Sequence, residues 1–270
     1  MDDTTKINST NSFEGELLKR ATDSGYLARR LEMNKDFQRY DFSQWAIEQI
    51  KPTKGDKVLD IGCGRGAQAI PISGIIDKTG EITLIDLSQD SVRYVLNCVR
   101  EKTKSHGING TMDNIASLLG PACNDYDLAY SVYALYYANN SNIVLNEMYN
   151  RLRPGGRLCI IGPDGPHGLV EIARKFHVIP SQVDNSFKFR SEVIEPFFKK
   201  NFSNFQISCL KNPQSFTVPN SLIEFYRQTT YYVKQAEKEL HEFAADQIKA
   251  KGALIYDKYS YAITATKGTL

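Results

Sequence analysis

The sequence has little excess charge of either sign and no long hydrophobic run. Its 270 residues include 33 Lys and Arg against 31 Asp and Glu, so the formal net charge is only +2. A basic surface of the kind that binds nucleic acid is therefore not expected. No apolar stretch approaches the length of a membrane span, and residues 1–5 are polar and acidic, unlike the apolar core of a secretion signal. We expect a soluble, cytoplasmic protein without nucleic-acid or membrane partners.

Cysteine and histidine are scarce, and neither shows the spacing of a metal site. The five cysteines form no C-x-x-C pair, and the four histidines are scattered along the chain. Such usage favours reduced thiols over a disulfide framework and predicts no bound metal. The length suffices for one large domain, or one domain with appendages, around a sizeable core.

What the sequence does contain is an apolar strand followed by alternate glycines. Residues 57–66, KVLDIGCGRG, combine that strand with a carboxylate at Asp60 and a loop that starts Gly62-Cys63-Gly64. Glycines let the chain turn tightly and let its backbone approach a ligand closely. We therefore expect this loop to contact a nucleotide-like ligand.

Two cofactors compete for such a loop. With Ala67 the run also fits G-x-G-x-x-A, the dinucleotide pattern in which a pyrophosphate sits on a helix N-terminus. The carboxylate of Asp60 would repel a pyrophosphate, but it would attract the ammonium and sulfonium groups of S-adenosylmethionine. S-adenosylmethionine is the favoured cofactor, and a dinucleotide or a purely structural turn are the alternatives.

A second acid ends the next expected strand. Residues 67–77 predict a helix, and residues 81–86 a buried strand that ends at Asp86. A carboxylate at this place can accept both hydroxyls of a ribose. Asp86 can instead be a helix N-terminal charge, because Ser88 is suited to cap a helix that runs to residue 104.

The third and fourth strands are expected at residues 108–113 and 126–133. Asp113 and Asn114 would stand at the carboxyl end of the weaker third strand, where they can contact an adenine; a solvated loop is the alternative. Residues 131–137, which begin with Ser131, would form the mouth of the fourth strand and border the methyl group.

The rest of the core continues the alternation of strand and helix. Residues 142–152 fit a helix, residues 153–156 a Pro-Gly-Gly turn, and residues 157–162 a fifth strand. Such alternation predicts a parallel sheet whose ligand lies beyond the carboxyl ends of the strands. Two further strands are expected at residues 204–210 and 259–266.

An ordered set of motifs within residues 51–165 resembles the class I S-adenosylmethionine-dependent methyltransferases, especially the branch that modifies small molecules. The motifs are VLDIGCGRG, LIDLS, YDLAYSVYAL and LNEMYNRLRPGGRL. The resemblance implies an α/β, Rossmann-like fold with a seven-stranded, mostly parallel sheet and an antiparallel last strand. It implies methionine binding by Asp60, Gly62 and Gly64, ribose binding by Asp86, and adenine contacts from Leu87, Asp113 and Asn114.

The flanks of the core are expected to carry specificity. We predict an N-terminal helical cap over residues 1–50, a cofactor-binding core over 51–165, and a C-terminal part, 166–270, that completes the sheet. The aromatic-rich stretch 34–45 can close over a ligand or simply pack between a helix and the sheet.

The C-terminal part contains a helical insert over residues 221–251. Ser221 and Glu224 form a capping-box pattern at its start, and Gly252 is a suitable stop. Its apolar residues fall on one face at helical spacing, which predicts a lid over the active site. A dimer interface is the alternative, so the protein can be a monomer or a homodimer.

The expected chemistry is a direct displacement of the methyl group, for which positioning and exclusion of water supply most of the catalysis. A base is needed only for a poor nucleophile. His167, at the mouth of the fifth strand, is a candidate base, and Tyr136 a candidate for orienting the acceptor. A solvated histidine and a packed tyrosine are the alternatives.

We therefore predict an S-adenosylmethionine-dependent methyltransferase that acts on a small molecule. A nucleic-acid (RNA) methyltransferase would share the core, but it should add a basic patch. A catalytically silent cofactor-binding subunit would share the core as well.

Overall fold

The computed structural model describes residues 20, 23–121, 123–166 and 168–269. These residues form two compact units. The small unit comprises the described residues up to Tyr40 with Gly165–Phe187 and Lys211–Tyr259, and the sheet unit comprises Asp41–Asp164, Lys188–Leu210 and the residues from Ser260 onward. Each unit thus draws on distant parts of the chain, and the division at residues 50 and 165 stays a prediction.

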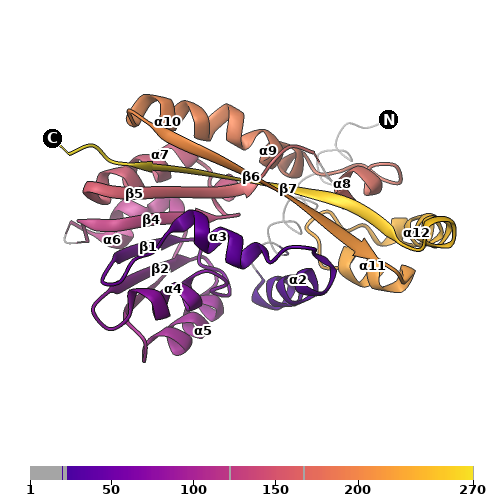
Figure 1. Cartoon of the computed structure of the whole chain (residues 1–270), viewed down its shortest axis with the longest axis horizontal. Coiled ribbons are helices and arrows are strands. Elements are labelled where there is room, and N and C mark those ends of the chain that lie inside the picture. The colour runs from indigo at the N-terminus through magenta and orange to yellow at the C-terminus, as the bar shows by residue number, and fades with distance from the viewer. Residues whose placement is uncertain (1–19, 21–22, 122, 167, 270) are drawn as a thin grey trace, which may run out of the picture. The chain divides into compact units, whose positions relative to one another are not determined.

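Seven strands form one sheet, in the order β3-β2-β1-β4-β5-β7-β6 (Figure 1). Strand β1 pairs in parallel with β2 and β4, β2 with β3, and β4 with β5, whereas β7 runs antiparallel to β5. The predicted Rossmann-like fold with a reversed last strand is confirmed. The strands are β1 Lys57–Ile61, β2 Glu81–Asp86, β3 Lys104–Asn109, β4 Tyr126–Val132, β5 Leu152–Pro163, β6 Phe205–Phe216 and β7 Leu254–Thr266.

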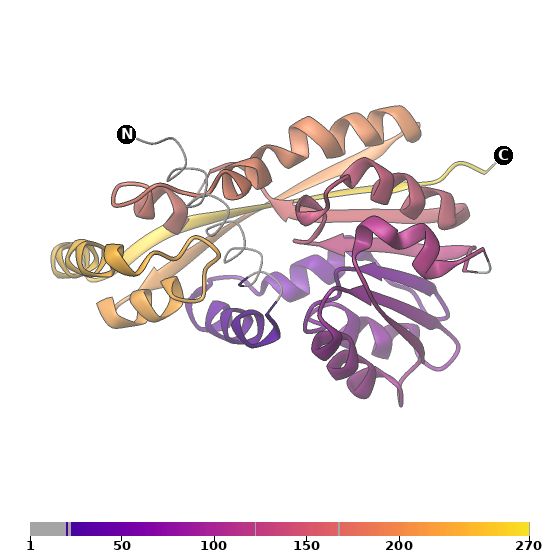
Figure 2. The same ribbon diagram turned by 180° about the vertical axis from the view of Figure 1, so that it is seen from behind.

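Both faces of the sheet are buried. Because side chains alternate along a strand, Leu158 and Ile160 of β5 enter one apolar cluster and Cys159 and Ile161 the other. One face is covered by α3 (Phe42–Ile50), α4 (Ala69–Ile76) and α5 (Gln89–Val99). The other is covered by α6 (Ile115–Leu119), α7 (Ser141–Arg151) and α10 (Glu195–Asn201). Helix α3 lies before the strands in Figure 1, and the magenta α6 and α7 lie before them in Figure 2.

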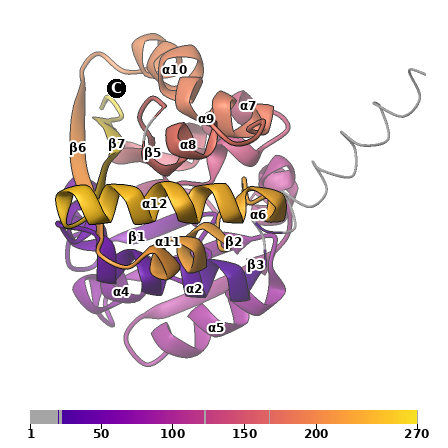
Figure 3. The ribbon, with the colours of Figure 1, turned by 90° about the vertical axis from the view of Figure 1, so that its right-hand side faces the viewer.

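The small unit has an aromatic core of its own. Phe37, the last residue of α2 (Ser24–Phe37), lies with its ring centroid 4.2 Å from that of Phe216 and 6.2 Å from that of Phe225. Helix α11 (Pro219–Tyr226), which carries Phe225, lies beside α12 (Glu237–Lys251) (Figure 3). The unit also contains α8 (Gly168–Ala173), and α9 (Ser181–Phe189) spans its boundary with the sheet unit. Helix α2 and the C-terminal insert therefore share one core.

The aromatic stretch 34–45 is divided between the units. Phe37 and Tyr40 belong to the small unit, whereas Phe42 and Trp45 belong to the sheet unit. Phe42 and Trp45 pack against the apolar cluster that α3, α4 and α5 cover. Phe37, Phe42 and Trp45 thus make packing contacts, and closure of this stretch over a ligand stays a prediction.

A third strand is present, but its predicted bounds are wrong. Strand β3 covers Lys104–Asn109 rather than residues 108–113, and α5 ends at Val99 rather than at residue 104. The strand lies at the edge of the sheet, and most of its residues are exposed, so it carries no buried apolar pattern. Gly107 is needed there because a Cβ would lie 2.6 Å from carbon atoms of Val92 and Leu96.

The remaining strands and turns agree better with expectation. Ser88 caps α5 as expected, and Gly252 ends α12 with a φ of +80°. Tyr126 faces Leu152 and Leu128 faces Arg157, so residues 153–156 bulge out of β5, which begins before the predicted turn rather than after it. Strands β6 and β7 are longer than predicted, because both continue into the small unit.

The predicted capping box at Ser221 is wrong. Helix α11 begins at Pro219, and its N-cap residue, Val218, makes no side-chain hydrogen bond. Proline has no backbone N–H that would need a partner at the first helical position. The helix can therefore start at Pro219, two residues before the expected start at Ser221, without a polar cap. The insert is two helices, α11 and α12, with a short 3-10 turn at Lys234–Ala236 between them.

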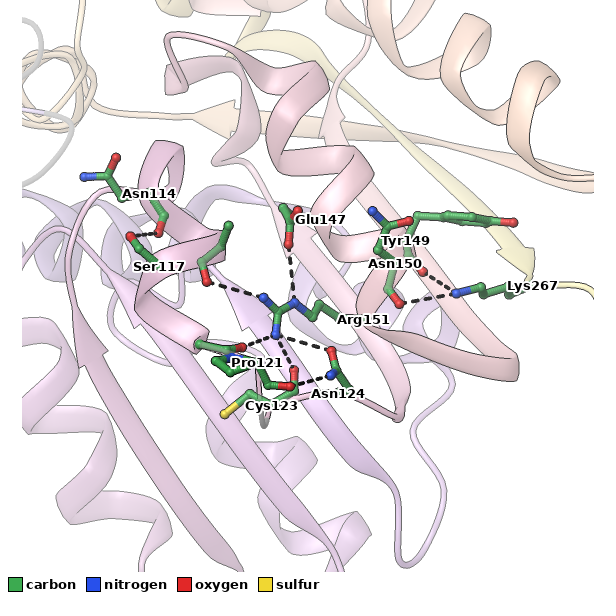
Figure 4. Close-up of polar contacts among 12 residues, drawn as sticks. Asn114, Ser117, Pro121, Cys123, Asn124, Glu147, Tyr149, Asn150, Arg151 and Lys267 are labelled. Atoms are coloured by element: carbon green, nitrogen blue, oxygen red, sulfur yellow. Dashed lines mark hydrogen bonds and ion pairs between the residues drawn. The ribbon is translucent and has the colours of Figure 1, made fainter.

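A buried arginine holds the segment between α6 and β4 (Figure 4). Arg151, at the end of α7, is only 8% exposed. Its guanidinium donates hydrogen bonds to the carbonyls of Ala116, Gly120 and Cys123 and to the side chains of Asn124 and Glu147. Each of these acceptors would lose its donor together with the guanidinium.

Arg151→Met should lower the free energy of unfolding by about 3 kcal/mol, because several part-buried carbonyls lose their charged donor at once. Urea unfolding measures the change. The control is Arg153→Met, whose side chain is 49% exposed and pairs with Asp127, and which should cost less than about 1 kcal/mol. Equal losses in the two variants would contradict a special role for Arg151.

Candidate cofactor and methyl-transfer site

Polar side chains gather at the carboxyl ends of the parallel strands. Asp60 is the penultimate residue of β1, and Asp86 is the last residue of β2. Asp164 directly follows β5, and Ser131 is the penultimate residue of β4. Because parallel strands point the same way, their ends meet at one edge of the sheet, as the sequence predicted.

The glycine loop is tied to the end of β2. The amide of Gly62 donates to the carbonyl of Ile85 at 2.8 Å, and the amide of Gly64 donates to Oδ2 of Asp86 at 2.8 Å. Oδ1 of Asp86 accepts the amide of Ser88 at 2.8 Å, directly before α5. Burial raises the pKa of Asp86, and these two amide hydrogen bonds oppose the shift. The loop is therefore held in place before any ligand binds.

Packing within the protein explains two glycines of the loop, Gly62 and Gly66. Gly62 has a φ of +78°, and a Cβ added to it would lie 2.3 Å from the Cβ of Ala134. Gly66 has a φ of +74°, and its Cβ would lie 2.8 Å from a methyl of Val95. Both positions exclude a larger residue by backbone conformation and by contact with the protein itself.

Asp60 is buried beneath the loop. It is 2% exposed, and Oδ2 accepts the hydroxyl of Tyr130 at 2.7 Å. Burial raises the pKa of Asp60 to about 8, opposed by the hydrogen bond from Tyr130 and helped by the nearby charge of Asp86. Burial also raises the pKa of the Cys63 thiol. At neutral pH the Asp60 carboxyl is thus largely protonated, and a cation placed beside it would favour its ionised form.

The predicted adenine and mouth residues have partners of their own. Oδ1 of Asp113 accepts the amide of Asn140 at 3.0 Å, and Oδ2 accepts the side chain of Asn139 at 3.0 Å, so Asp113 anchors the start of α7. The buried hydroxyl of Ser131 donates to the carbonyl of Ile61 at 2.7 Å, directly before the loop. These contacts leave the cofactor roles of Asp113 and Ser131 as predictions.

Two predicted adenine contacts lie near the end of β3. Leu87 is 51% exposed, which leaves its surface open to a flat ligand. Asn114 ends the short 3-10 turn Met112–Asn114. Asn109, which the sequence did not single out, donates to the carbonyls of Asp86 and Leu87 at 3.1 and 2.8 Å and so fixes the Leu87 backbone.

The two predicted catalytic residues differ in what the structure says of them. Tyr136 lies in a 3-10 turn, Leu135–Tyr137, directly after β4, and its ring contacts Tyr137 and Phe189 with centroids 4.6 and 6.1 Å apart. His167 lies outside the described residues. Both assignments stay predictions.

A charged pair that the sequence reading missed stands at the same edge. Arg190 Nη1 lies 3.1 Å from Oδ2 of Asp164. Tyr133, directly after β4, has a φ of +55°, and its hydroxyl lies 2.7 Å from Oγ of Ser260. The sequence could have singled out Asp164, because this residue lies just after an expected strand, much as Asp86 ends one.

The described part of the chain shows no metal centre and no membrane helix. No group of three or more His, Cys, Asp or Glu among the described residues could hold a metal ion. No helix there is long and apolar enough to cross a bilayer.

The raised pKa of Asp60 should make stability depend on pH. The pKa of Asp60 is about 8 in the folded state and about 4 in the unfolded state, so the folded state holds the proton more tightly. The contribution of this proton to folding stability is complete below the unfolded pKa and is lost as the pH rises through about 8. Asp60→Asn should flatten this fall by about 1 kcal/mol per pH unit. Urea unfolding between about pH 5 and 8 measures the slope. The exposed Asp90 provides the control, Asp90→Asn, and a slope unchanged in Asp60→Asn would contradict the prediction.

A family profile described as a methyltransferase domain matches residues 52–244. The chain is 29% identical over 143 residues to a ubiquinone/menaquinone biosynthesis C-methyltransferase, UbiE, of Shewanella pealeana, over 52% of this chain and 55% of the relative. It is 28% identical over 147 residues to the O-methyltransferase rstn1 of Aspergillus nomiae, over 52% and 64%. The chain spans little more than half the length of these curated relatives.

The fold is also that of a solved methyltransferase. Phosphoethanolamine N-methyltransferase 2 of Haemonchus contortus, solved with phosphomonomethylethanolamine and S-adenosylhomocysteine, superposes with a TM-score of 0.54 at 18% identity, over 85% of this chain and 53% of that one. At this identity the likeness concerns the fold alone. With the family match and the seven-stranded sheet, it leads to one conclusion: this chain belongs to the class I S-adenosylmethionine-dependent methyltransferases.

Proposed function

We propose that this chain binds S-adenosylmethionine and transfers its methyl group to a small-molecule acceptor by direct displacement. The observation that carries the proposal is the arrangement of Asp60, the glycine loop and Asp86 at one edge of the sheet. A buried carboxyl that favours a neighbouring cation fits the ammonium and sulfonium groups of this cofactor and does not fit a pyrophosphate. We also propose a cytoplasmic protein, monomeric or homodimeric.

Each part of the cofactor has residues suited to it. Asp60 and the backbone of residues 62–64 would hold the methionine part. Asp86 accepts one amide on each oxygen, and a carboxylate has about four acceptor sites, so two remain for the ribose hydroxyls. Leu87 would cover the adenine, with Asp113 and Asn114 at its edge.

The reaction needs little covalent chemistry from the protein. When bound, the cofactor supplies a methyl group on a sulfonium that already is a good leaving group. The residues after β4 and β5 would position the acceptor and exclude water. Tyr136 would orient the acceptor, and His167 is the candidate base that the sequence offers where the nucleophile carries a proton.

The relatives support a small acceptor rather than a nucleic acid. One is named a C-methyltransferase of quinone biosynthesis and the other an O-methyltransferase. A nucleic-acid methyltransferase is disfavoured by the formal net charge of only +2, which provides no large basic surface.

Asp86→Ala should weaken the binding of S-adenosylhomocysteine by about 2 kcal/mol, roughly 30-fold, because hydrogen bonds to a charged acceptor are lost. Calorimetry measures the affinity, and thermal unfolding checks that the variant is folded. Asp90→Ala, on the exposed face of α5, is the control and should bind like the wild type.

Two outcomes would count against the cofactor assignment. Unchanged affinity in a folded Asp86→Ala variant would remove Asp86 from the site. Binding of a nicotinamide dinucleotide by the wild-type protein, without binding of S-adenosylmethionine or S-adenosylhomocysteine, would overturn the proposed function.

The predicted lid concerns the ligand-bound protein. If residues 34–45 and 221–251 close over a ligand, their amide hydrogens should exchange more slowly with S-adenosylhomocysteine present than without it, since closure orders them. Hydrogen-exchange mass spectrometry measures the rates. Unchanged exchange, together with loss of a dimer in Phe243→Ser, would assign the apolar stripe to a subunit interface.

A further inference from the structure

A carboxylate stands where β5 ends, beside the end of β4. Pro163, the last residue of β5, is in register with Ser260 of β7, and Ser260 is hydrogen-bonded to Tyr133, the first residue after β4. Asp164 is close enough to Tyr133 for its charge to help raise the pKa of that tyrosine, which burial raises most. The carboxylate thus belongs to the part of the sheet edge where the methyl group is expected.

The carboxylate is held on one side only. Oδ2 of Asp164 lies 3.1 Å from Nη1 of Arg190 and accepts a weak hydrogen bond from the thiol of Cys209 at 3.6 Å. Within the described part of the chain no hydrogen bond reaches Oδ1, and the side chain is 20% exposed. One oxygen is therefore fixed by a cation while the other can receive a donor from a ligand.

The arginine that holds it is fixed in turn. Nε of Arg190 lies 3.4 Å from Oε1 of Glu195, and the guanidinium lies 6.0 Å from the ring centroid of Tyr261. Arg190 also begins a π-helical turn, Arg190–Ile194, a geometry that recurs at functional sites. This makes Arg190 a positioning residue for the carboxylate.

The surroundings of Asp164 are aromatic. Tyr133 and Tyr261 are near enough for the charge of Asp164 to help raise their pKa values, which burial raises most. The ring of Phe42 meets that of Tyr133 edge-on, with centroids 5.5 Å apart. Tyr261 is buried in the core, but Tyr133 is half-buried, so part of its ring can border a flat ligand that carries a hydrogen-bond donor.

We propose that Asp164 binds and deprotonates the methyl acceptor, and that this acceptor presents a phenolic hydroxyl to it. The proposal rests on the methyl transfer proposed above. A neutral hydroxyl is a poor nucleophile and gains from a base, whereas a neutral amine or a thiolate needs none. Among these nucleophiles, the open oxygen of Asp164 is of most use to a hydroxyl.

The step balances with the groups named. The phenolic oxygen forms its new bond to the methyl carbon while the carbon–sulfur bond breaks, and the electron pair of that bond remains on sulfur as a neutral thioether. The hydroxyl proton passes to Oδ1 of Asp164. The carboxylate becomes a carboxylic acid and returns its proton to solvent after the product leaves.

The test compares two phenols that differ in acidity. With 4-methylphenol, which is un-ionised at neutral pH, Asp164→Asn should lower kcat at least about 100-fold, the range of general-base catalysis. With 4-nitrophenol, a much stronger acid of which a substantial fraction is already ionised at neutral pH, the loss should be much smaller. The affinity for S-adenosylhomocysteine should stay within about twofold of the wild type, because Asp164 serves the acceptor side.

A matched carboxylate provides the control. Asp127 of β4 also pairs with an arginine, Arg153, at 2.5 Å, but near the amino end of its strand. Asp127→Asn should leave the ratio of the two phenols unchanged. Arg190→Met should lower kcat for 4-methylphenol more than for 4-nitrophenol. Arg190→Lys, which keeps the positive charge, should retain part of the kcat for 4-methylphenol that Arg190→Met loses.

Each result bears on a separate claim. Equal losses for both phenols in Asp164→Asn, or none, would overturn the role of Asp164 as a base. If the wild-type protein binds S-adenosylmethionine but methylates neither phenol, the assignment of a phenolic acceptor is wrong. If it does not bind S-adenosylmethionine at all, the proposed function itself fails.

Discussion

The carboxylate of Asp86 joins the turns from which the cofactor edge is built. One oxygen accepts the amide of Gly64 in the glycine loop, and the other accepts the amide of Ser88, the residue that caps α5. Its backbone carbonyl accepts donors from Asn109 and Gly110 at the end of β3. A ligand therefore meets loops that are already ordered, which lowers the entropy lost on binding.

Burial of both sheet faces explains why the chemistry is at one edge. Parallel strands covered by helices on both sides leave little room for charged groups along their length. Asp60 is buried all the same. Burial raises the pKa of its carboxyl, which accepts a hydrogen bond from Tyr130. Asp86 and Asp164, at the strand ends, remain partly exposed and can act on a ligand.

The small unit is assembled from three separate parts of the chain. Its parts are the described residues up to Tyr40, which include α2, residues 165–187, and residues 211–259, and its core joins Phe37 to Phe216 and Phe225. The family profile matches residues 52–244 and so leaves out the N-terminal part of that core.

The sequence alone determined the glycine loop, the acids that follow it, the central strands and the order of the core elements. These features depend on local patterns: alternate glycines, buried apolar runs and capping residues. The edge strand β3 was expected four residues too late because its residues are mostly exposed, and the start of α11 was misplaced because proline stands where a polar cap was expected. Only the tertiary structure decided that Gly62 packs on Ala134, that Tyr130 meets Asp60 and that Arg190 holds Asp164. These partners are distant in sequence, and the fold brings them together.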